Sequence, residues 1–342
     1  MDCKIRKLEI DQLWGQYNVL WELNEDVNIL SGINGSGKST ILDCLAASFV
    51  NKDSKEFLTD RMKQIRIFSN DGMIFHYEEF RQSISKLRFL AGEDGKNAEL
   101  YRDILKDIEE NELLKREKIT SVKFNFLNQN GISKFKGKVN IDVISTFDTA
   151  ITIEEETFNE KVRTDLDREL YFLQKKYLDY QLNLAKGFQE ILKDNRENIQ
   201  KSYDEMYSSL NLFKSYVKDF FYGKKLDEEK NDISFVLISN NKKLDIYSLS
   251  SGEKQLLLIL LVFLLQDRKP SVVFLDEPEI SLHFDWQKRL IEVMRSLNPN
   301  AQLIIATHSP AMVMNGWVDK IVNIDDIKTL GNKNNTTNEL TD

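Results

Sequence analysis

A glycine-rich segment of the sequence has the residue types and spacing of a phosphate-binding loop. Gly32, Gly37, Lys38 and Ser39 follow the pattern Gly-x-x-x-x-Gly-Lys-Ser, with an apolar run before it and a helix-like apolar stretch after it. Glycines adopt backbone conformations closed to other residues, so that backbone amides can close around phosphate oxygens. The lysine would neutralise the β- and γ-phosphates, and the serine hydroxyl would bind Mg²⁺. We therefore expect ATP at Asn34, Gly35, Ser36, Gly37, Lys38, Ser39 and Thr40.

Two acids, Asp276 and Glu277, directly follow the apolar run Val272 to Leu275. A buried strand would deliver both carboxylates to the carboxyl edge of a sheet, where ligands bind in open α/β folds. Asp276 would hold Mg²⁺, and Glu277 would polarise the attacking water. An acid pair at a strand end is common in isolation, but Pro278 and the upstream phosphate loop favour the catalytic interpretation.

Two further segments have the composition of nucleotide-sensing sites. Ser250, Ser251, Gly252 and Glu253 precede a long apolar run, where an ordinary helix N-cap is the alternative interpretation. His308 follows an apolar strand and comes after the acid pair. A lone histidine is usually structural, but an imidazole at this place could hydrogen-bond the γ-phosphate or the water.

Strands and helices in the expected order would position these residues. Period-2 patterns and short apolar runs predict strands at Ile5–Ile10, Val27–Leu30, Ser271–Leu275, Leu303–Ala306 and Lys320–Ile324. Helical stretches between the later strands predict a parallel sheet with crossover helices. We also expect a helix over Asn97–Lys118 and a hairpin that pairs Val122–Leu127 with Ser133–Asn140.

The segment 155–232 has a different pattern, with apolar residues at alternating steps of four and three. Such a narrow seam favours packing against another helix. An antiparallel hairpin with arms of about 40–50 Å is the leading interpretation. A single continuous helix, pairing with a second subunit, and an amphipathic subdomain folded on the head are the alternatives. The two series are Leu166, Leu170, Leu173, Tyr177, Tyr180, Leu184, and Ile199, Tyr203, Met206, Leu210, Phe213, Val217, Phe220.

Composition excludes several classes of protein. The 342 residues are 41% apolar and 30% charged, which suits a folded α/β protein, and the net charge of −8 argues against wholesale wrapping of nucleic acid. The two cysteines, Cys3 and Cys44, suggest no metal site or disulfide framework. We see no secretory signal, and the apolar run Leu256–Leu265 is too short for a bilayer, so a buried helix in a cytoplasmic protein is expected.

The four motifs, in this order, resemble the ATPase heads of the ABC superfamily, and most closely its SMC, RecF and OLD-like branch. The opening IRKLEIDQLWGQYNVLWELNEDVNILSGINGSGKST and the extended acid motif LDEPEISLHFDWQ carry the resemblance, which covers about residues 1–150 and 235–325. The chain also looks similar to stand-alone ATPases of anti-phage systems such as Septu, PARIS and retron-associated modules.

The resemblance implies an α/β P-loop NTPase fold with a mainly parallel sheet, an N-terminal antiparallel β lobe and a helical, coiled-coil-like insertion. It implies that Ser250 and Gly252 act in trans on nucleotide held by a second subunit, so that the chain works as a head-to-head dimer. The sequence departs from the family pattern at Ser251, where a second glycine is usual, and at Ser281-Leu282-His283, where no D-loop aspartate stands. Candidates for the Q-loop are Gln64, Gln82, Gln129 and the stretch Ser145–Asp148.

We expect four segments: 1–154 and 233–327 as the halves of the head, 155–232 as the insertion, and 328–342 as a polar tail without regular structure. The leading hypothesis is an ATPase subunit of a defence system that controls a separate effector, such as a nuclease or toxin. A DNA-repair clamp and a nucleotide-gated scaffold with little turnover are the alternatives. DNA is a possible partner and a membrane is not.

Overall fold

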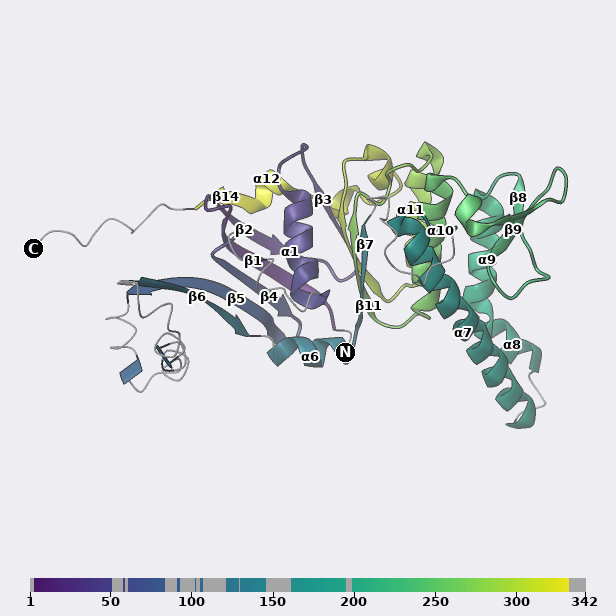
Figure 1. The fold of residues 1–342 in the computed structure, drawn as a ribbon, viewed down its shortest axis with the longest axis horizontal. Coiled ribbons are helices and arrows are strands. Elements are labelled where there is room, and N and C mark those ends of the chain that lie inside the picture. The colour runs from purple at the N-terminus through teal and green to yellow at the C-terminus, as the bar shows by residue number, and fades with distance from the viewer. Residues whose placement is uncertain are drawn as a thin grey trace, which may run out of the picture. The chain divides into compact units, whose positions relative to one another are not determined.

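The computed structural model describes residues 3–50, 58, 61–83, 91–92, 102, 105–106, 121–128, 130–145, 161–194 and 199–331 (Figure 1). These form two compact units. Unit 1 comprises residues 1–4, 24–43 and 136–324, and unit 2 comprises 5–23, 44–135 and 325–342. All the predicted catalytic and phosphate-binding residues belong to unit 1.

A five-stranded sheet forms the centre of unit 1, in the order β13-β3-β12-β11-β7, and every neighbouring pair in it is parallel. Its strands are β3 (Val27–Ser31), β7 (Asn140–Ser145), β11 (Ser271–Asp276), β12 (Ala301–Ala306) and β13 (Ile321–Asn323). β11 and β12 are buried along their whole length. Strands buried on both faces read as continuous apolar runs, which is why Val272–Leu275 lacks alternation.

Helices α10 (Ser251–Leu265) and α11 (Phe284–Leu297) pack with this sheet in one apolar core. α10 contains the predicted apolar run Leu256–Leu265, and all but a few of its side chains are buried. The prediction of a buried helix there is confirmed. Among the described helices, none combines the length and the apolarity that a bilayer span requires.

The predicted insertion contains α7 (Asp165–Asp194), α8 (Ile199–Met206) and α9 (Ser208–Phe220). Tyr177 contacts Phe213 at 6.0 Å between ring centroids, and Phe188 contacts Tyr203 at 5.3 Å, so the two arms run antiparallel (Figure 1). The base of α7, including Leu166 and Leu170, belongs to the core that contains α10. Two of the predictions are therefore each correct for a part of this segment. Helix α7 forms an antiparallel hairpin with α8 and α9, and its base packs into the core of the head.

Three short strands follow the hairpin and form a separate antiparallel sheet in the order β10-β9-β8. They are β8 (Lys224–Leu226), β9 (Ser234–Leu237) and β10 (Lys243–Asp245), and a 3-10 turn, η1 (Ile246–Ser248), leads from them into α10. Phe221 and Phe235 stack at 5.0 Å between ring centroids, which anchors this sheet in the apolar core.

Unit 2 contains a six-stranded antiparallel sheet in the order β14-β2-β1-β4-β5-β6, and it confirms the expected antiparallel lobe. Its strands are β1 (Ile5–Leu13), β2 (Tyr17–Glu22), β4 (Gln64–Ser69), β5 (Gly72–Ser83), β6 (Ser121–Asn128) and β14 (Lys328–Leu330). Three remaining elements near the C-terminus are η2 (Pro310–Val313), η3 (Val318–Lys320) and α12 (Ile324–Ile327).

Two predictions of secondary structure are wrong. Residues Ser133–Asn140 form no hairpin strand, because Asn130–Lys136 is helix α6 and β6 pairs with β5. Buried Ile132 and Phe135 stand three residues apart, which is helical spacing. The tail also begins with structure, since β14 pairs antiparallel with β2. Residues 332–342 and most of the predicted helix Asn97–Lys118 lie outside the described residues.

Candidate functional site

The carboxyl ends of the parallel strands bring the predicted residues to one edge of the sheet. Across that edge, Leu30 of β3 is in register with Ala306 of β12, Ala306 with Asp276 of β11, and Asp276 with Ser145 of β7. The phosphate loop, the acid pair and His308 each begin within two residues of this line. Segments more than 200 residues apart in sequence thus meet at this edge because parallel strands end together.

The phosphate loop occupies the turn between β3 and helix α1 (Lys38–Val50). Gly35 has a φ of 76° and Gly37 a φ of 109°, conformations that side chains disfavour. Lys38 is only 3% exposed, and its Nζ donates to the carbonyl oxygens of Gly32 and Ile33 at 3.2 and 3.4 Å. Lys38 therefore binds carbonyl groups of its own loop. Helix α1 begins at Lys38, directly after Gly37.

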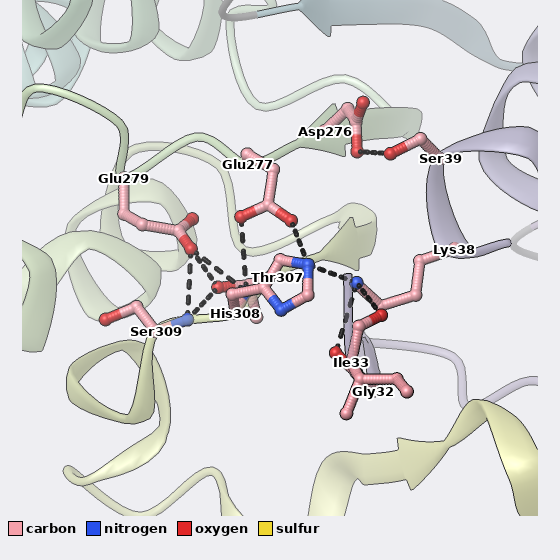
Figure 2. A network of polar contacts seen from close by, with 10 residues as sticks. All are labelled: Gly32, Ile33, Lys38, Ser39, Asp276, Glu277, Glu279, Thr307, His308 and Ser309. Carbon is pink, nitrogen blue, oxygen red and sulfur yellow. Dashed lines mark hydrogen bonds and ion pairs between the residues drawn. The ribbon is translucent and has the colours of Figure 1, made fainter. Parts of the chain in front are cut away.

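Ser39 and Asp276 form the first contact between the loop and the acid pair (Figure 2). The Ser39 hydroxyl donates to Asp276 Oδ1 at 3.0 Å. Burial raises the pKa of Asp276, while the Ser39 hydrogen bond and the charge of Lys38 lower it. Hydroxyl and carboxylate oxygens are suitable ligands for Mg²⁺. This ion usually binds one or two protein groups and keeps several water ligands. The pair fits such an ion, and no larger cluster of candidate metal ligands occurs among the residues that the structure describes.

Glu277 faces His308 at the next position of the edge. Its Oε1 lies 3.3 Å from His308 Nε2, and its Oε2 accepts from the backbone N–H of His308 at 3.2 Å (Figure 2). The backbone of Glu277 is left-handed, with a φ of 47°, which is uncommon outside glycine. Burial, together with the neighbouring Glu279 carboxylate, raises the pKa of Glu277 to about 7. A carboxylate with such a pKa is suited to accept a proton near neutral pH.

Lys38 and His308 also contact each other, through Nζ and Nε2. Burial lowers the pKa of both groups, and the charge of Lys38 lowers the pKa of His308 further. The His308 side chain is still 35% exposed, so the ring reaches the surface of the edge. Lysine, histidine and glutamate thus converge around one point beside the Ser39–Asp276 pair, while Asn34, Gly35, Ser36, Gly37 and Thr40 line the loop and the first turn of α1.

Glu279 is a residue of this site that the sequence did not single out. It is 6% exposed, and its Oε1 accepts from the Thr307 hydroxyl and from the backbone N–H groups of His308 and Ser309, the last two at 3.3 and 3.2 Å. It therefore holds the turn that carries His308 (Figure 2). The only signal in the sequence was a third acid, two positions after Glu277.

The segment Ser250–Glu253, which resembles the ABC signature motif and is called the signature turn below, is a capped helix start. Ser250 caps α10, and Glu253 closes a capping box by accepting from the backbone N–H and hydroxyl of Ser250 at 3.0 and 2.9 Å. Ser251 is the first residue of the helix. Glu253 also pairs with Lys224 of β8 at 2.5 Å, and Lys254 pairs with buried Asp167 of α7 at 2.7 Å. The N-cap alternative is thus present in the structure, and it leaves the helix N-terminus ordered.

Gly252 makes a close approach that the sequence did not reveal. A Cβ atom added there would overlap the backbone carbonyl of Ser281. Ser281 itself has a φ of 67°, and it belongs to the segment that stands in place of the D-loop. The signature glycine is therefore required for contact between the start of α10 and the loop after the acid pair.

The Q-loop candidates fall in three places. Gln64 belongs to unit 2, where its amide contacts His76 at 2.9 Å and donates to Glu78 at 3.0 Å. Gln129 and residues 146–148 lie outside the described residues, and the side chain of Gln82 is not described. Ser145 ends β7 in register with Asp276, which puts the start of the stretch Ser145–Asp148 at the functional edge. All four candidates for the Q-loop remain predictions.

Comparison with protein families gives one match that spans most of the chain. Residues 27–314 match the family described as "AAA domain, putative AbiEii toxin, Type IV TA system". The chain is 24% identical to the Septu protein PtuA of Bacillus thuringiensis over 343 aligned residues, which cover 93% of this chain and 75% of PtuA.

Two retron proteins match over shorter stretches. The "Retron Vc95 probable ATPase" of Vibrio cholerae serotype O1 biovar El Tor is 28% identical over 110 residues, and the "Retron Ec83 probable ATPase" of Escherichia coli is 26% identical over 139 residues. The matched parts cover 28% and 37% of this chain, but only 21% and 26% of the retron proteins.

Among solved structures, an SMC head bound to the C-terminal winged-helix domain of ScpA is similar over 96% of both chains, with a TM-score of 0.50 and 16% identity. This likeness shows the fold alone, and it confirms the expected α/β P-loop head. The chain therefore belongs to the family described as "AAA domain, putative AbiEii toxin, Type IV TA system", and it is similar in sequence to the Septu protein PtuA and to two probable ATPases of retrons.

Proposed function

We propose that this chain binds and hydrolyses ATP as a head-to-head dimer, and that it is the sensor and regulatory subunit of an anti-phage system with a separate effector. The observation that carries the proposal is the convergence of Lys38, Ser39, Asp276, Glu277 and His308 at one sheet edge. Each of these groups has a distinct part in phosphoryl transfer to water.

ATP would be the substrate, and the bond to its γ-phosphate would be hydrolysed. Mg²⁺ would neutralise charge on the phosphates. The loop 32–40 would hold the phosphates through its backbone amides, the first turn of α1 and Lys38. Ser39 and Asp276, already 3.0 Å apart, would hold the ion from both sides of the edge. On binding, Lys38 would exchange its contacts with the loop carbonyls and His308 for phosphate oxygens.

Glu277 would orient the attacking water and accept its proton. Its carboxylate is only 12% exposed, so it competes with little bulk water, and a pKa raised to about 7 brings it close to the pH at which it would work. His308 lies beside it and would hydrogen-bond the γ-phosphate. Glu279 would hold the backbone of His308 while this occurs.

The proposed dimer rests on the signature turn. Ser250 and Glu253 satisfy each other and Lys224, rather than contacting the five residues of the edge. We therefore assign Ser250, Ser251, Gly252 and Glu253 to nucleotide held by a second chain. Isologous pairing of two heads then makes two composite sites.

Mixing two inactive variants tests this assignment. Lys38→Ala removes phosphate binding but keeps the signature turn, whereas Ser250→Arg blocks the turn but keeps the loop. If the sites are composite, mixed dimers hold one intact site, and random mixing restores about one quarter of natural turnover. If the turn acts within its own chain, both variants stay inactive when mixed, and the head-to-head proposal fails. Mixing either variant with Glu277→Gln, Ser250→Arg chains is the matched control.

The regulatory role rests on the similarity to Septu PtuA and the retron ATPases. A tagged Glu277→Gln chain, expected to remain in the ATP-bound state, would be expressed in its native host and recovered with bound protein and nucleic acid. We expect one specific co-purifying effector of nuclease or toxin type. Recovery of DNA without a protein partner would instead favour a repair clamp, and recovery of neither would contradict both.

A further inference from the structure

Gln287, in the first turn of α11, forms hydrogen bonds with two segments of the sheet edge at once. Its Nε2 donates to the backbone carbonyl oxygens of Leu282 and Glu279 at 3.0 and 3.4 Å, and its Oε1 accepts from the Ser309 hydroxyl at 2.6 Å. Gln287 has no part in the chemistry proposed for the site. Its single amide group nevertheless joins the loop that follows the acid pair to the turn that carries His308.

The orientation of this amide follows from its partners. Both carbonyl groups only accept hydrogen bonds, so the amide NH₂ must face them and the amide oxygen must face Ser309. The Ser309 hydroxyl donates its one proton to that oxygen, and it accepts from the backbone N–H of Ala311 at 3.2 Å, where it caps η2. A glutamine is therefore specified at this position, because a glutamate of the same size keeps the acceptor but loses both donors.

Gln287 also reaches the part of the loop that touches the signature turn. Leu282, whose carbonyl it binds, is 7% exposed and belongs to the core that contains α10. The preceding carbonyl, of Ser281, lies 2.2 Å from the place where a Cβ atom of Gly252 would stand, so the loop and the start of α10 are in direct contact. Because packed atoms leave no space between them, a shift of the helix start toward the loop moves the loop as well.

Three segments of unit 1 are thus connected in series: the start of α10, the loop 277–283 and the turn 307–309. Under the proposed head-to-head pairing, the first segment serves nucleotide held by a second chain. The last segment carries the histidine of this chain's own site. Packed atoms and hydrogen bonds that join two sites can carry an energetic coupling, and such couplings typically change affinity by about 5- to 150-fold.

We propose that Gln287 is a positioning residue that couples the signature turn of its chain to His308 of the same chain. It acts through the Leu282 carbonyl on one side and the Ser309 hydroxyl on the other. The inference rests on the composite sites of the proposed function. Nucleotide at the site that a turn serves would adjust, through Gln287, the histidine at the other site of the dimer.

Amide hydrogen exchange on the full chain without nucleotide tests the connection itself. Gln287→Met keeps the length of the side chain but removes all three hydrogen bonds. We expect exchange to become about tenfold faster at residues 307–311, at residues 280–283 and in the first turn of α10. Glu292→Met, at an exposed position of the same helix, is the control and should leave all three segments unchanged. Faster exchange at 307–311 alone would limit Gln287 to a local role and overturn the coupling.

Gln287→Glu separates the two sides of the connection. It keeps an acceptor for the Ser309 hydroxyl but has no donor for the Leu282 and Glu279 carbonyls. Exchange at residues 280–283 and at the start of α10 should therefore rise as in Gln287→Met, whereas exchange at 307–311 should stay near that of the natural chain. Equal exchange at 307–311 in the two variants would show that the Ser309 bond does not position the turn, which contradicts the proposal.

Mixed dimers test the coupling through turnover. A dimer of one Lys38→Ala chain and one Ser250→Arg chain has a single intact site, built from the edge of the Ser250→Arg chain and the turn of the Lys38→Ala chain. Gln287→Met in the Ser250→Arg chain should lower turnover about 10- to 100-fold, with KM for ATP within about twofold, because a misplaced histidine affects the chemical step.

The second placement of Gln287→Met is the decisive one. In the Lys38→Ala chain the edge is already inactive, so a residue that only supported its own His308 would have no effect there. A residue that also holds the signature turn should lower turnover of the intact site by about three- to tenfold. Turnover unchanged by this placement would overturn the coupling.

The outcome is separable from that of the proposed function. If mixing Lys38→Ala with Ser250→Arg chains restores no turnover, the composite sites fail, whereas faster exchange of Gln287→Met at all three segments would retain the connection between the turn and His308. If mixing restores turnover but Gln287→Met changes neither exchange nor turnover, the proposed function stands and the coupling fails.

Discussion

The sheet edge and the signature turn differ in how complete they are within one chain. At the edge, the loop, the acid pair and the histidine contact one another across β3, β11 and β12. At the turn, Ser250, Glu253 and Lys224 satisfy one another. The sheet edge is a cluster of basic, acidic and hydroxyl side chains, several of which have shifted pKa values. The turn is a helix start that carries its own capping box.

The difference indicates where each region gets its geometry. The edge depends on long-range sheet register, because its members come from strands far apart in sequence. The turn depends on a local capping box and on the close approach of Gly252 to Ser281. Substitutions of the reactive groups Lys38, Glu277 and His308 should therefore change chemistry with little effect on folding, whereas substitutions of Glu279 or around the turn should first change stability.

Lys38→Ala is expected to have the largest effect, because it removes the cation of the phosphate loop. We expect it to abolish detectable nucleotide binding, measured by titration with a fluorescent ATP analogue. Lys242→Ala, at an exposed lysine of the turn before β10, is the control and should bind as the natural chain does. Tight binding by Lys38→Ala would show that the edge is not the nucleotide site.

Glu277→Gln comes next, and it separates chemistry from binding. Loss of the positioned base should cut turnover by roughly 10²–10⁴, the usual contribution of such a group. ATP affinity should stay within a few fold, because the loop is intact. Phosphate release and nucleotide binding on the same preparation check both statements. Unchanged turnover would favour a nucleotide-gated scaffold.

Glu279→Ala tests the support of the edge rather than its chemistry. The substitution removes the acceptor of the Thr307 hydroxyl and one of the two acceptors of the backbone N–H groups of His308 and Ser309, which also donate to Glu277 Oε2 and Thr307 Oγ1. We expect the free energy of unfolding to fall by about 3 kcal/mol, measured in urea. One unsatisfied buried donor costs about 1–3 kcal/mol, and the weaker binding of the two N–H groups puts the loss at the upper end of that range. Glu279→Gln keeps one acceptor oxygen and should recover much of that stability. Equal losses in both variants would mean that the charge of Glu279, and not its acceptor, supports the turn.

Gly252→Ala should give the smallest of these effects, and it probes the turn. The added methyl group overlaps the Ser281 carbonyl, so the loop or the helix must shift. Overpacking of this kind costs about 1–3 kcal/mol, which thermal unfolding would detect. Ser251→Ala, one residue earlier and exposed, should change stability by less than about 0.5 kcal/mol. A Gly252→Ala chain as stable as the natural one would contradict the close approach.

The sequence predicted the edge well because its motifs are short and each is attached to a strand end. Val27–Leu30, Ser271–Leu275 and Leu303–Ala306 are strands as expected, and parallel pairing then brings Lys38, Asp276 and His308 together. Pattern and spacing were sufficient, because parallel strands end at a common edge.

The residues that the sequence missed act through contacts without a local pattern. Glu279 accepts hydrogen bonds from a hydroxyl and two backbone N–H groups 28 to 30 positions away, and Gly252 contacts a carbonyl 29 positions away. The false hairpin at Ser133–Asn140 had the opposite cause. The Asn-Gly pair there predicts a turn between strands, but buried Ile132 and Phe135 stabilise helix α6 instead.

The left-handed backbone of Glu277 has a consequence for anyone who engineers this chain. Glycine adopts a φ of 47° without cost, whereas a glutamate there stores on the order of 1–3 kcal/mol of strain. A substitution at position 277 that raises heat tolerance is therefore expected to lower ATP turnover. A directed-evolution library selected only for survival on heating would be expected to enrich glycine at position 277, and so to accumulate robust chains that no longer consume ATP.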